Sequence, residues 1–177
     1  MIGKTINVLR TRGIAGLMFA VNSRIRHLLP IRVARSFQRF ESLFHGKNGI
    51  EIGGVSRVFY RKNIFPVYPI VGHLDNCNFS NTTVWEGSIN EGQTFQFDRK
   101  KPCGHQYISE ATAMEYIPSG NYDFVLSSHM LEHTANPILA LSEWKRLLKD
   151  QGMMVILLPP TLNPITYFTH FRKLCPS

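Results

Sequence analysis

Acidic residues are absent from the first forty residues of this 177-residue chain, which hold eight lysines and arginines. The other residues carry twelve basic and twelve acidic side chains, so the whole formal charge of +8 belongs to the N-terminal segment. A folded domain with this balance is neutral, which argues against a uniformly basic nucleic-acid-binding protein. We therefore expect no nucleic acid among its partners.

Cysteine is scarce. Cys77, Cys103 and Cys175 are odd in number, widely spaced and without a CxxC pair. This pattern excludes a disulfide framework and gives little support to a zinc site. We expect free thiols, a reducing compartment such as the cytoplasm, and no bound metal.

Long apolar runs are also lacking. The stretch from Gly13 to Val21 is apolar for only nine residues, whereas about twenty are needed to cross a bilayer. Residues 1–45 instead interleave arginines with apolar residues, which predicts a basic amphipathic helical segment. Three interpretations of this segment stay open: a peripheral helix on an anionic membrane or a partner, a transit peptide, and a lid helix packed on the domain that follows.

The remaining composition is that of a folded domain, with 44% hydrophobic and 18% charged residues. Residues 122–126 form an apolar run typical of a buried parallel strand, and residues 153–158 form another. Between them, Asn136 and Pro137 supply the start of an amphipathic helix, and Gly152, which tolerates a positive φ, follows its end. Strand, helix and strand in this order predict a βαβ unit.

Residues 122–159, with the wording YDFVLSSHMLEHTANPILALSEWKRLLKDQGMMVILLP, resemble the class I S-adenosylmethionine-dependent methyltransferases. Within that family they are similar to the type 11-like subgroup, which carries LEH after the fourth strand. The resemblance implies an α/β three-layer sandwich with a Rossmann-like, mainly parallel five-stranded sheet over residues 46–160. After it we expect an irregular, shortened tail over residues 161–177, without the family's usual C-terminal strand hairpin.

The same resemblance implies S-adenosylmethionine as the cofactor and methyl transfer to a small-molecule or glycan-like acceptor. The segment GIEIGG resembles the family's first motif and contains Glu51, Gly53 and Gly54. Glycine at this point lets the backbone turn sharply and approach a nucleoside closely. Asp75 is the candidate for the ribose, because an acidic residue about twenty positions after such a turn commonly clasps the ribose hydroxyls.

By the resemblance, Glu110 accepts a hydrogen bond from the adenine amino group and Ala111 gives the ring room. Ser128 and His129 fall near the transferred methyl group, and His129 is the candidate general base for a hydroxyl acceptor. Each residue also has a purely structural interpretation: Asp75 could cap a turn, Glu110 could be an exposed loop acid, and the histidine could bond within its own loop.

Two alternatives of other classes stay open. One is a non-catalytic protein of the same fold that binds a membrane or a partner through its N-terminal segment. Two observations motivate it: the short C-terminus, and the residues Val55, Ser56 and Arg57 at positions where further glycines are expected. The other is a nicotinamide-dependent enzyme, which the single GG turn disfavours. The acceptor and the oligomeric state cannot be read from the residues.

Overall fold

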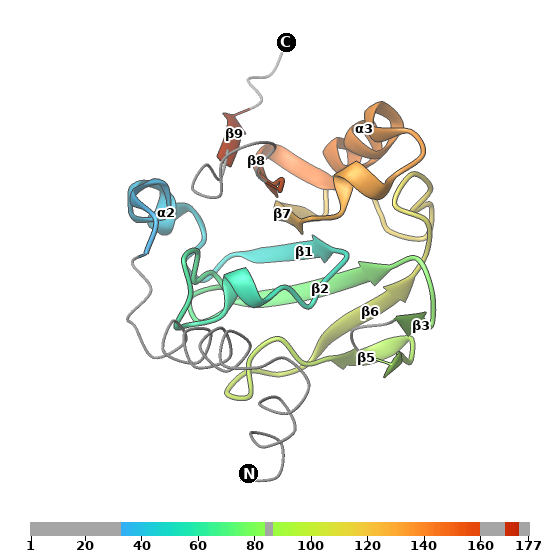
Figure 1. Cartoon of the computed structure of the whole chain (residues 1–177), viewed down its shortest axis with the longest axis horizontal. Coiled ribbons are helices and arrows are strands. Elements are labelled where there is room, and N and C mark those ends of the chain that lie inside the picture. The colour runs from blue at the N-terminus through green and yellow to red at the C-terminus, as the bar shows by residue number, and fades with distance from the viewer. Residues whose placement is uncertain (1–32, 84–86, 160–168, 174–177) are drawn as a thin grey trace, which may run out of the picture. The chain divides into compact units, whose positions relative to one another are not determined.

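The computed structural model describes residues 33–83 and 87–159, and the backbone of residues 169–173. Its main sheet has seven strands in the order β5-β6-β2-β1-β7-β8-β9 (Figure 1). A separate two-stranded ribbon pairs β3 (Thr82–Thr83) with β4 (Gly87–Ser88). The strands of the main sheet are β1 (Asn48–Ile52), β2 (His73–Asn78), β5 (Gly92–Phe95), β6 (Gly104–Ile108), β7 (Tyr122–Ser128), β8 (Leu148–Leu157) and β9 (Thr169–Lys173).

The five central strands, β6, β2, β1, β7 and β8, are all parallel to one another. This confirms the predicted α/β class and the five parallel strands. Ile50 of β1 lies opposite Asp75 of β2 on one side and Val125 of β7 on the other, which aligns the carboxyl ends of these strands at one edge. Open α/β sheets bind their ligands at this edge.

Antiparallel strands extend the sheet at both sides, through β5 beside β6 and β9 beside β8. The prediction of an irregular tail after residue 160 therefore needs a correction at residues 169–173, where Phe171 pairs with Val155. Backbone groups make this pairing and satisfy the outer edge of β8. The residues of β9, THFRK, show no clear apolar alternation, so the sequence pattern did not reveal the strand.

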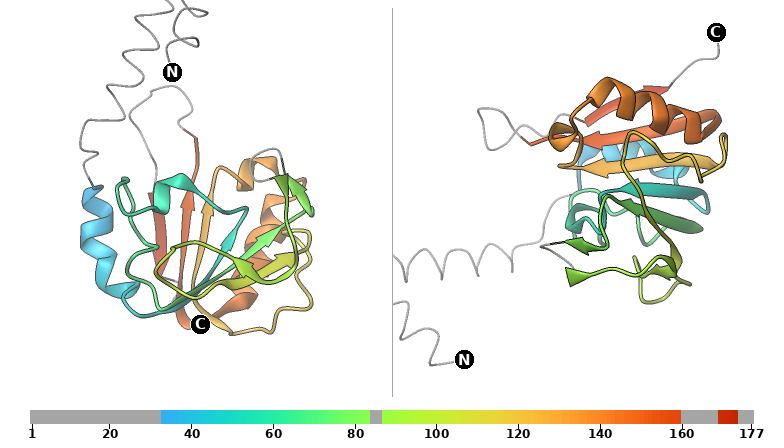
Figure 2. Two further views of the ribbon diagram at one scale, coloured as in Figure 1. Left: turned by 90° about the horizontal axis from the view of Figure 1, so that it is seen from below. Right: turned by 90° about the vertical axis from the view of Figure 1, so that its right-hand side faces the viewer.

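Helical segments lie on both faces of the sheet (Figure 2). On one face, α2 (Arg35–Phe40) and the 3₁₀ turn η2 (Arg57–Phe59) contribute Phe37 and Phe59 to a buried aromatic cluster. Phe44, which follows the 3₁₀ turn η1 (Glu41–Leu43), belongs to the same cluster. In it, the Phe37 ring centre lies 4.9 Å from that of Phe65, and Phe44 lies 5.3 Å from Phe124. Edge-on contacts of this kind stabilise a core beyond the area they bury.

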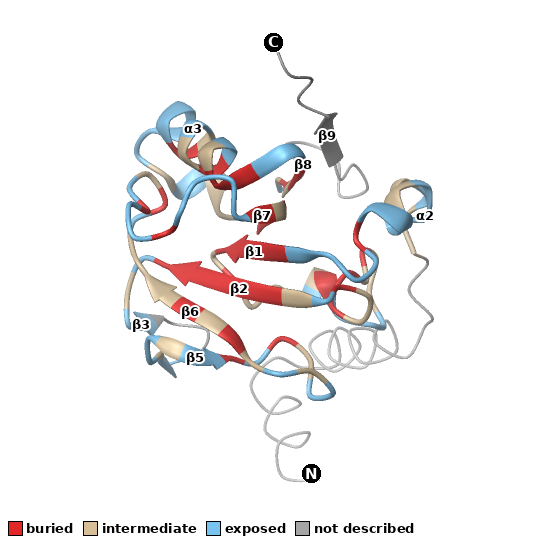
Figure 3. Cartoon of the chain, turned by 180° about the vertical axis from the view of Figure 1, so that it is seen from behind, coloured by how far each residue is buried: buried red, intermediate tan, exposed pale blue. Residues whose placement is uncertain are grey.

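The other face is covered by α3 (Pro137–Leu147), which buries Trp144 completely against β-strand residues such as Ile50 and Val125. Figure 3 shows buried residues concentrated along the central strands. The predicted helix start is confirmed, because the side chain of Asn136 accepts a hydrogen bond from the Leu139 N–H at 3.0 Å and Pro137 opens the helix.

The prediction for the helix end is wrong in one respect: the residue with positive φ is Gln151, at 65°, and not Gly152. Glycine is needed at 152 for a different reason. A Cβ there would lie 2.8 Å from the carbonyl oxygen of Lys149.

Residues 1–32 lie outside the described residues, so the three interpretations of the N-terminal segment stay predictions. Within the described remainder of that segment, Phe37 packs into the core. None of the helices that the structure describes is long and apolar enough to cross a membrane. Cys77 and Cys103 are free thiols, and burial raises the pKa of Cys77 to about 12.

Candidate cofactor and methyl-transfer site

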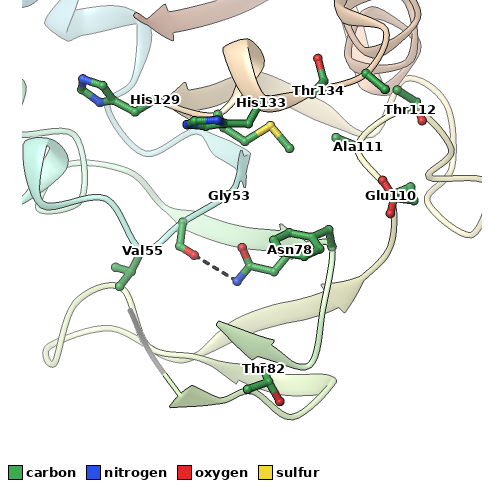
Figure 4. A pocket seen from close by; sticks show the side chains of 14 residues that line it. Gly53, Val55, Asn78, Thr82, Glu110, Ala111, Thr112, His129, His133 and Thr134 are labelled. Atoms are coloured by element: carbon green, nitrogen blue, oxygen red, sulfur yellow. Dashed lines mark hydrogen bonds between the residues drawn. The ribbon is translucent and has the colours of Figure 1, made fainter. Parts of the chain in front are cut away.

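A cavity of about 660 Å³ opens at the carboxyl ends of β1, β2, β6 and β7 (Figure 4). This volume is in the range of small-molecule sites. Of the predicted site residues, the cavity brings together Gly53, Gly54, Glu110, Ala111 and His129. The rest of its lining is Val55, Asn78, Phe79, Thr82, Thr112, Met130, His133, Thr134 and Ala135.

The glycine turn after β1 forms one wall of the cavity. Gly53 has φ 80°, and a Cβ on it would lie 2.7 Å from Cγ of Met130. A Cβ on Gly54 would lie 2.4 Å from Cδ of Glu51 and 2.8 Å from Oδ1 of Asn76. Both contacts are shorter than a carbon atom allows, so glycine is required at both positions.

Glu51 lies behind this turn and does not line the cavity. Its carboxylate is fully buried and accepts hydrogen bonds from the Ser56 N–H at 3.1 Å and from the Tyr68 hydroxyl at 2.5 Å. Burial and the neighbouring carboxylate together raise the pKa of Tyr68 well above its usual value. Glu51 therefore fixes the backbone that leaves the turn.

Two asparagines of β2 hold the Gly54 peptide from the other side. The Gly54 N–H donates to Oδ1 of Asn76 at 3.0 Å, and Nδ2 of Asn76 donates to Oε1 of Gln106 at 2.8 Å. Nδ2 of Asn78 donates to the Gly54 carbonyl at 3.1 Å. Since that bond sets which way the Asn78 amide points, its oxygen is left facing the cavity as an acceptor (Figure 4).

The structure does not bring Asp75 to the cavity. Its carboxylate accepts hydrogen bonds from the His105 N–H and the Tyr122 hydroxyl, both at 2.7 Å, and lies 2.8 Å from Nε2 of His73. Burial and this carboxylate raise the pKa of Tyr122. The strand runs three residues beyond Asp75, so Asn78, which sequence reasoning missed, stands at its carboxyl end.

Glu110 and Ala111 reach the cavity from the loop after β6. Side chains of α3 hold this loop: Nε1 of Trp144 donates to the Ala111 carbonyl at 2.9 Å, and Arg146 donates to the Met114 carbonyl at 2.9 Å. Glu143 accepts the Met114 N–H, also at 2.9 Å. The helix therefore sets the position of this wall.

His129 follows β7 and lines the cavity with φ 54°, in the left-handed region that L side chains avoid. Its N–H donates to the Leu157 carbonyl at 2.8 Å, and its Nδ1 lies 3.0 Å from Oγ of Ser128. Ser128 itself is not part of the lining, so it touches the site only through the histidine. His133, from the LEH turn η3 (Leu131–His133), adds a second imidazole.

The described residues contain no group of three or more histidine, cysteine or acidic side chains able to hold a metal ion. The cavity lining carries one carboxylate, Glu110, and no lysine or arginine. Its polar contacts therefore come from backbone, amide, hydroxyl and imidazole groups.

Residues 76–156 match the family described as methyltransferase domain. Over this segment the chain is similar to the methyltransferase domain family. The segment contains Asn78 of β2, the cavity-lining residues of the loops after β6 and β7, and the whole of α3. This similarity implies S-adenosylmethionine as the cofactor.

Solved structures with similar folds were also found, whereas no curated protein matches the chain. A SAM-dependent methyltransferase from Aquifex aeolicus is 11% identical with a TM-score of 0.49, over 76% of this chain and 69% of its own. An arsenic(III) S-adenosylmethionine methyltransferase from Chlamydomonas reinhardtii is 16% identical with a TM-score of 0.48, over 65% and 39%.

A third similar structure, the [4+2]-cyclase SpnF, is 13% identical with a TM-score of 0.46, over 69% of this chain and 44% of its own. The chain spans about half the length of two further similar structures, 46% of one and 52% of the other. The assignment of the methyltransferase domain rests on the family match over residues 76–156.

Proposed function

We propose that this chain binds S-adenosylmethionine in the cavity and transfers its methyl group to a small-molecule or glycan-like acceptor. The observation that carries the proposal is the position of the cavity. It lies at the carboxyl ends of the strands of a methyltransferase domain and joins the glycine turn, a buried amide acceptor and an imidazole in one space.

The residues present suit the cofactor. Gly53 and Gly54 line the cavity and offer their backbone to the amino-acid part of the cofactor. A Cβ on either would collide with the protein itself, with Met130 at Gly53 and with Glu51 at Gly54. Asn78 offers a single acceptor oxygen to a ribose hydroxyl, because its Nδ2 is occupied by the Gly54 carbonyl. Glu110 and Ala111 line the same cavity. In this proposal Glu110 accepts the adenine amino group and Ala111 leaves room for the ring.

The cofactor supplies a methyl carbon that is already electrophilic because it is bound to a positively charged sulfur. The chain's own task is to align the acceptor with that carbon and exclude water. In this scheme His129 accepts the proton of an acceptor hydroxyl on Nε2, while Ser128 keeps Nδ1 oriented. His129 would hold the proton released from the acceptor hydroxyl, and the bound cofactor would supply the methyl group.

Calorimetric titration of the purified chain with S-adenosylhomocysteine tests the proposal. We expect binding that Asn78→Ala weakens by about 1–3 kcal/mol, the usual loss when a buried hydrogen-bonding group is removed. Asn121→Ala, at an exposed asparagine outside the cavity lining, is the matched control and leaves the affinity unchanged. Absence of binding by a demonstrably folded chain contradicts the proposal.

A second candidate function is a non-catalytic module that keeps the fold and binds a membrane or a partner. Val55 favours it, because this side chain occupies the cavity wall directly after Gly54, where the family resemblance leads us to expect further glycine. The same titration separates the two functions. If the folded chain does not bind S-adenosylhomocysteine, only the non-catalytic function of the two is left.

A further inference from the structure

Cationic side chains gather on three segments of the folded unit: residues 33–43, 55–72 and 96–101. Between them these segments contain only two acidic residues, Glu41 and Asp98. We call the set of cations the basic face; it comprises Arg35, Arg39, Arg57, Arg61, Lys62, Arg99, Lys100 and Lys101. All but Lys101, which is half-buried, are exposed.

The segments that carry the basic face pack against one another. The Ala34 N–H donates to the Ile64 carbonyl at 2.8 Å, and the Tyr68 ring centre lies 5.9 Å from that of Phe97. The Lys101 ammonium donates to a backbone carbonyl of the second segment. Figure 1 shows α2 and the connection between β1 and β2 on the side of the sheet away from α3.

The charges of the basic face are not neutralised within the described residues, because none of its members forms an ion pair there. Burial and the nearby positive charge of Arg61 lower the pKa of Lys101, although Asp98 partly offsets them. The exposed acids Glu115, Glu132 and Asp150 lie elsewhere, in the loop after β6, in η3 and at the start of β8. The described unit is therefore basic on one side, although its sequence is nearly neutral in total.

Two apolar side chains are exposed on these same segments: Leu43 is 50% exposed and Tyr60 is 41% exposed. Cations with intervening aliphatic and aromatic groups are typical of surfaces that rest in the headgroup layer of a membrane. The chain also enters the unit at Val33, and residues 1–32 add six basic residues and no acidic one.

We propose that the basic face docks on an anionic phospholipid bilayer. Its guanidinium and ammonium groups pair with lipid phosphates, while Leu43 and Tyr60 insert among the headgroups. A nucleic-acid backbone supplies phosphate but no apolar layer for those two side chains, which is why a membrane is the better partner. The proposal is independent of methyl transfer.

Co-sedimentation of the full chain with vesicles tests the proposal, using phosphatidylcholine alone and phosphatidylcholine with about 30% phosphatidylserine, within the range of anionic leaflets. We expect binding only to the anionic vesicles and a steep loss as salt is added. The double variant Arg61→Glu/Lys62→Glu should lower the partition coefficient at least tenfold.

Lys145→Glu/Lys149→Glu is the matched control, because it changes the net charge by the same amount on α3 and at the start of β8. Residues 1–32 are unchanged in both variants, so their own contribution cancels. Thermal melts establish that both variants fold. The proposal is overturned by equal losses in the two variants, by equal binding to neutral vesicles, by no vesicle binding, or by capture of a labelled RNA duplex in place of vesicles.

Discussion

At the scale of single residues, His129 combines an unfavourable backbone with a position in the cavity. An L side chain in the left-handed region costs about 1–2 kcal/mol, and such outliers often occur at functional sites. Gln151 also has a positive φ, 65° against 54° at His129, but lies outside the cavity lining. The two residues therefore allow backbone strain and function to be measured separately.

We predict that His129→Gly leaves the free energy of unfolding unchanged or raises it by up to about 1 kcal/mol, because relief of the left-handed strain outweighs the entropy of glycine. The same variant should slow methyl transfer to a hydroxyl acceptor by about 10²–10⁴-fold, the usual contribution of a general base. Gln151→Gly should change the free energy of unfolding in the same way as His129→Gly but should keep full activity. Urea unfolding measures the stability of each variant and a methyl-transfer assay measures its activity. Full activity of His129→Gly would contradict the role of His129 as general base.

The cofactor residues show how far sequence reasoning reaches at this scale. Gly53 and Gly54 could be predicted because only glycine fits a close turn, and the structure shows that both positions exclude a Cβ. The prediction of Asp75 depends on where β2 ends. Because the strand runs three residues further, Asn78 lines the cavity and Asp75 does not.

At the scale of elements, α3 both covers the sheet and holds the loop that carries Glu110 and Ala111. Arg146 donates to both carboxylate oxygens of Glu143, at 2.6 and 2.9 Å, and to the backbone carbonyls of Met114 and Ile117. The helix could be predicted from its apolar spacing and its cap. Its contacts with the loop could not, since they join residues about thirty positions apart.

The ion pair between Glu143 and Arg146 should make the free energy of unfolding depend on pH. Hydrogen bonds from Arg146 lower the pKa of Glu143 below its usual 4.5, so the stabilisation is complete above that value and is lost as the pH falls toward the folded pKa. We predict that Glu143→Gln is less stable than the wild type by about 1 kcal/mol at neutral pH. The two proteins should converge in acid.

Urea unfolding from pH 7 to pH 3 measures this difference. Glu132→Gln is the control, because that exposed glutamate forms no ion pair among the described residues. A constant gap between wild type and Glu143→Gln across the pH range would show that lost packing, and not the charge, causes the difference.

At the scale of the whole unit, the parallel centre of the sheet was predictable and its edges were not. Buried parallel strands are marked by their own apolar runs, such as 122–126, whereas β5 and β9 pair through backbone groups that every residue possesses. The basic face could not be predicted from the sequence either. Arg61 and Lys101 are forty positions apart, and only the packing of their segments shows that their charges add.

The cavity draws its walls from the ends of four parallel strands, so ligand binding is linked to the unfolding of the central sheet and not of one loop. We predict that S-adenosylhomocysteine at one hundred times its dissociation constant raises the free energy of unfolding by about 2.7 kcal/mol, with about 1.4 kcal/mol more for each further tenfold. Asn78→Ala should shift this dependence to higher concentration without changing its slope.

A nicotinamide dinucleotide is the control, because the single GG turn lacks the glycines that a pyrophosphate needs. Stabilisation by the dinucleotide in place of S-adenosylhomocysteine would reverse the assignment of the cavity.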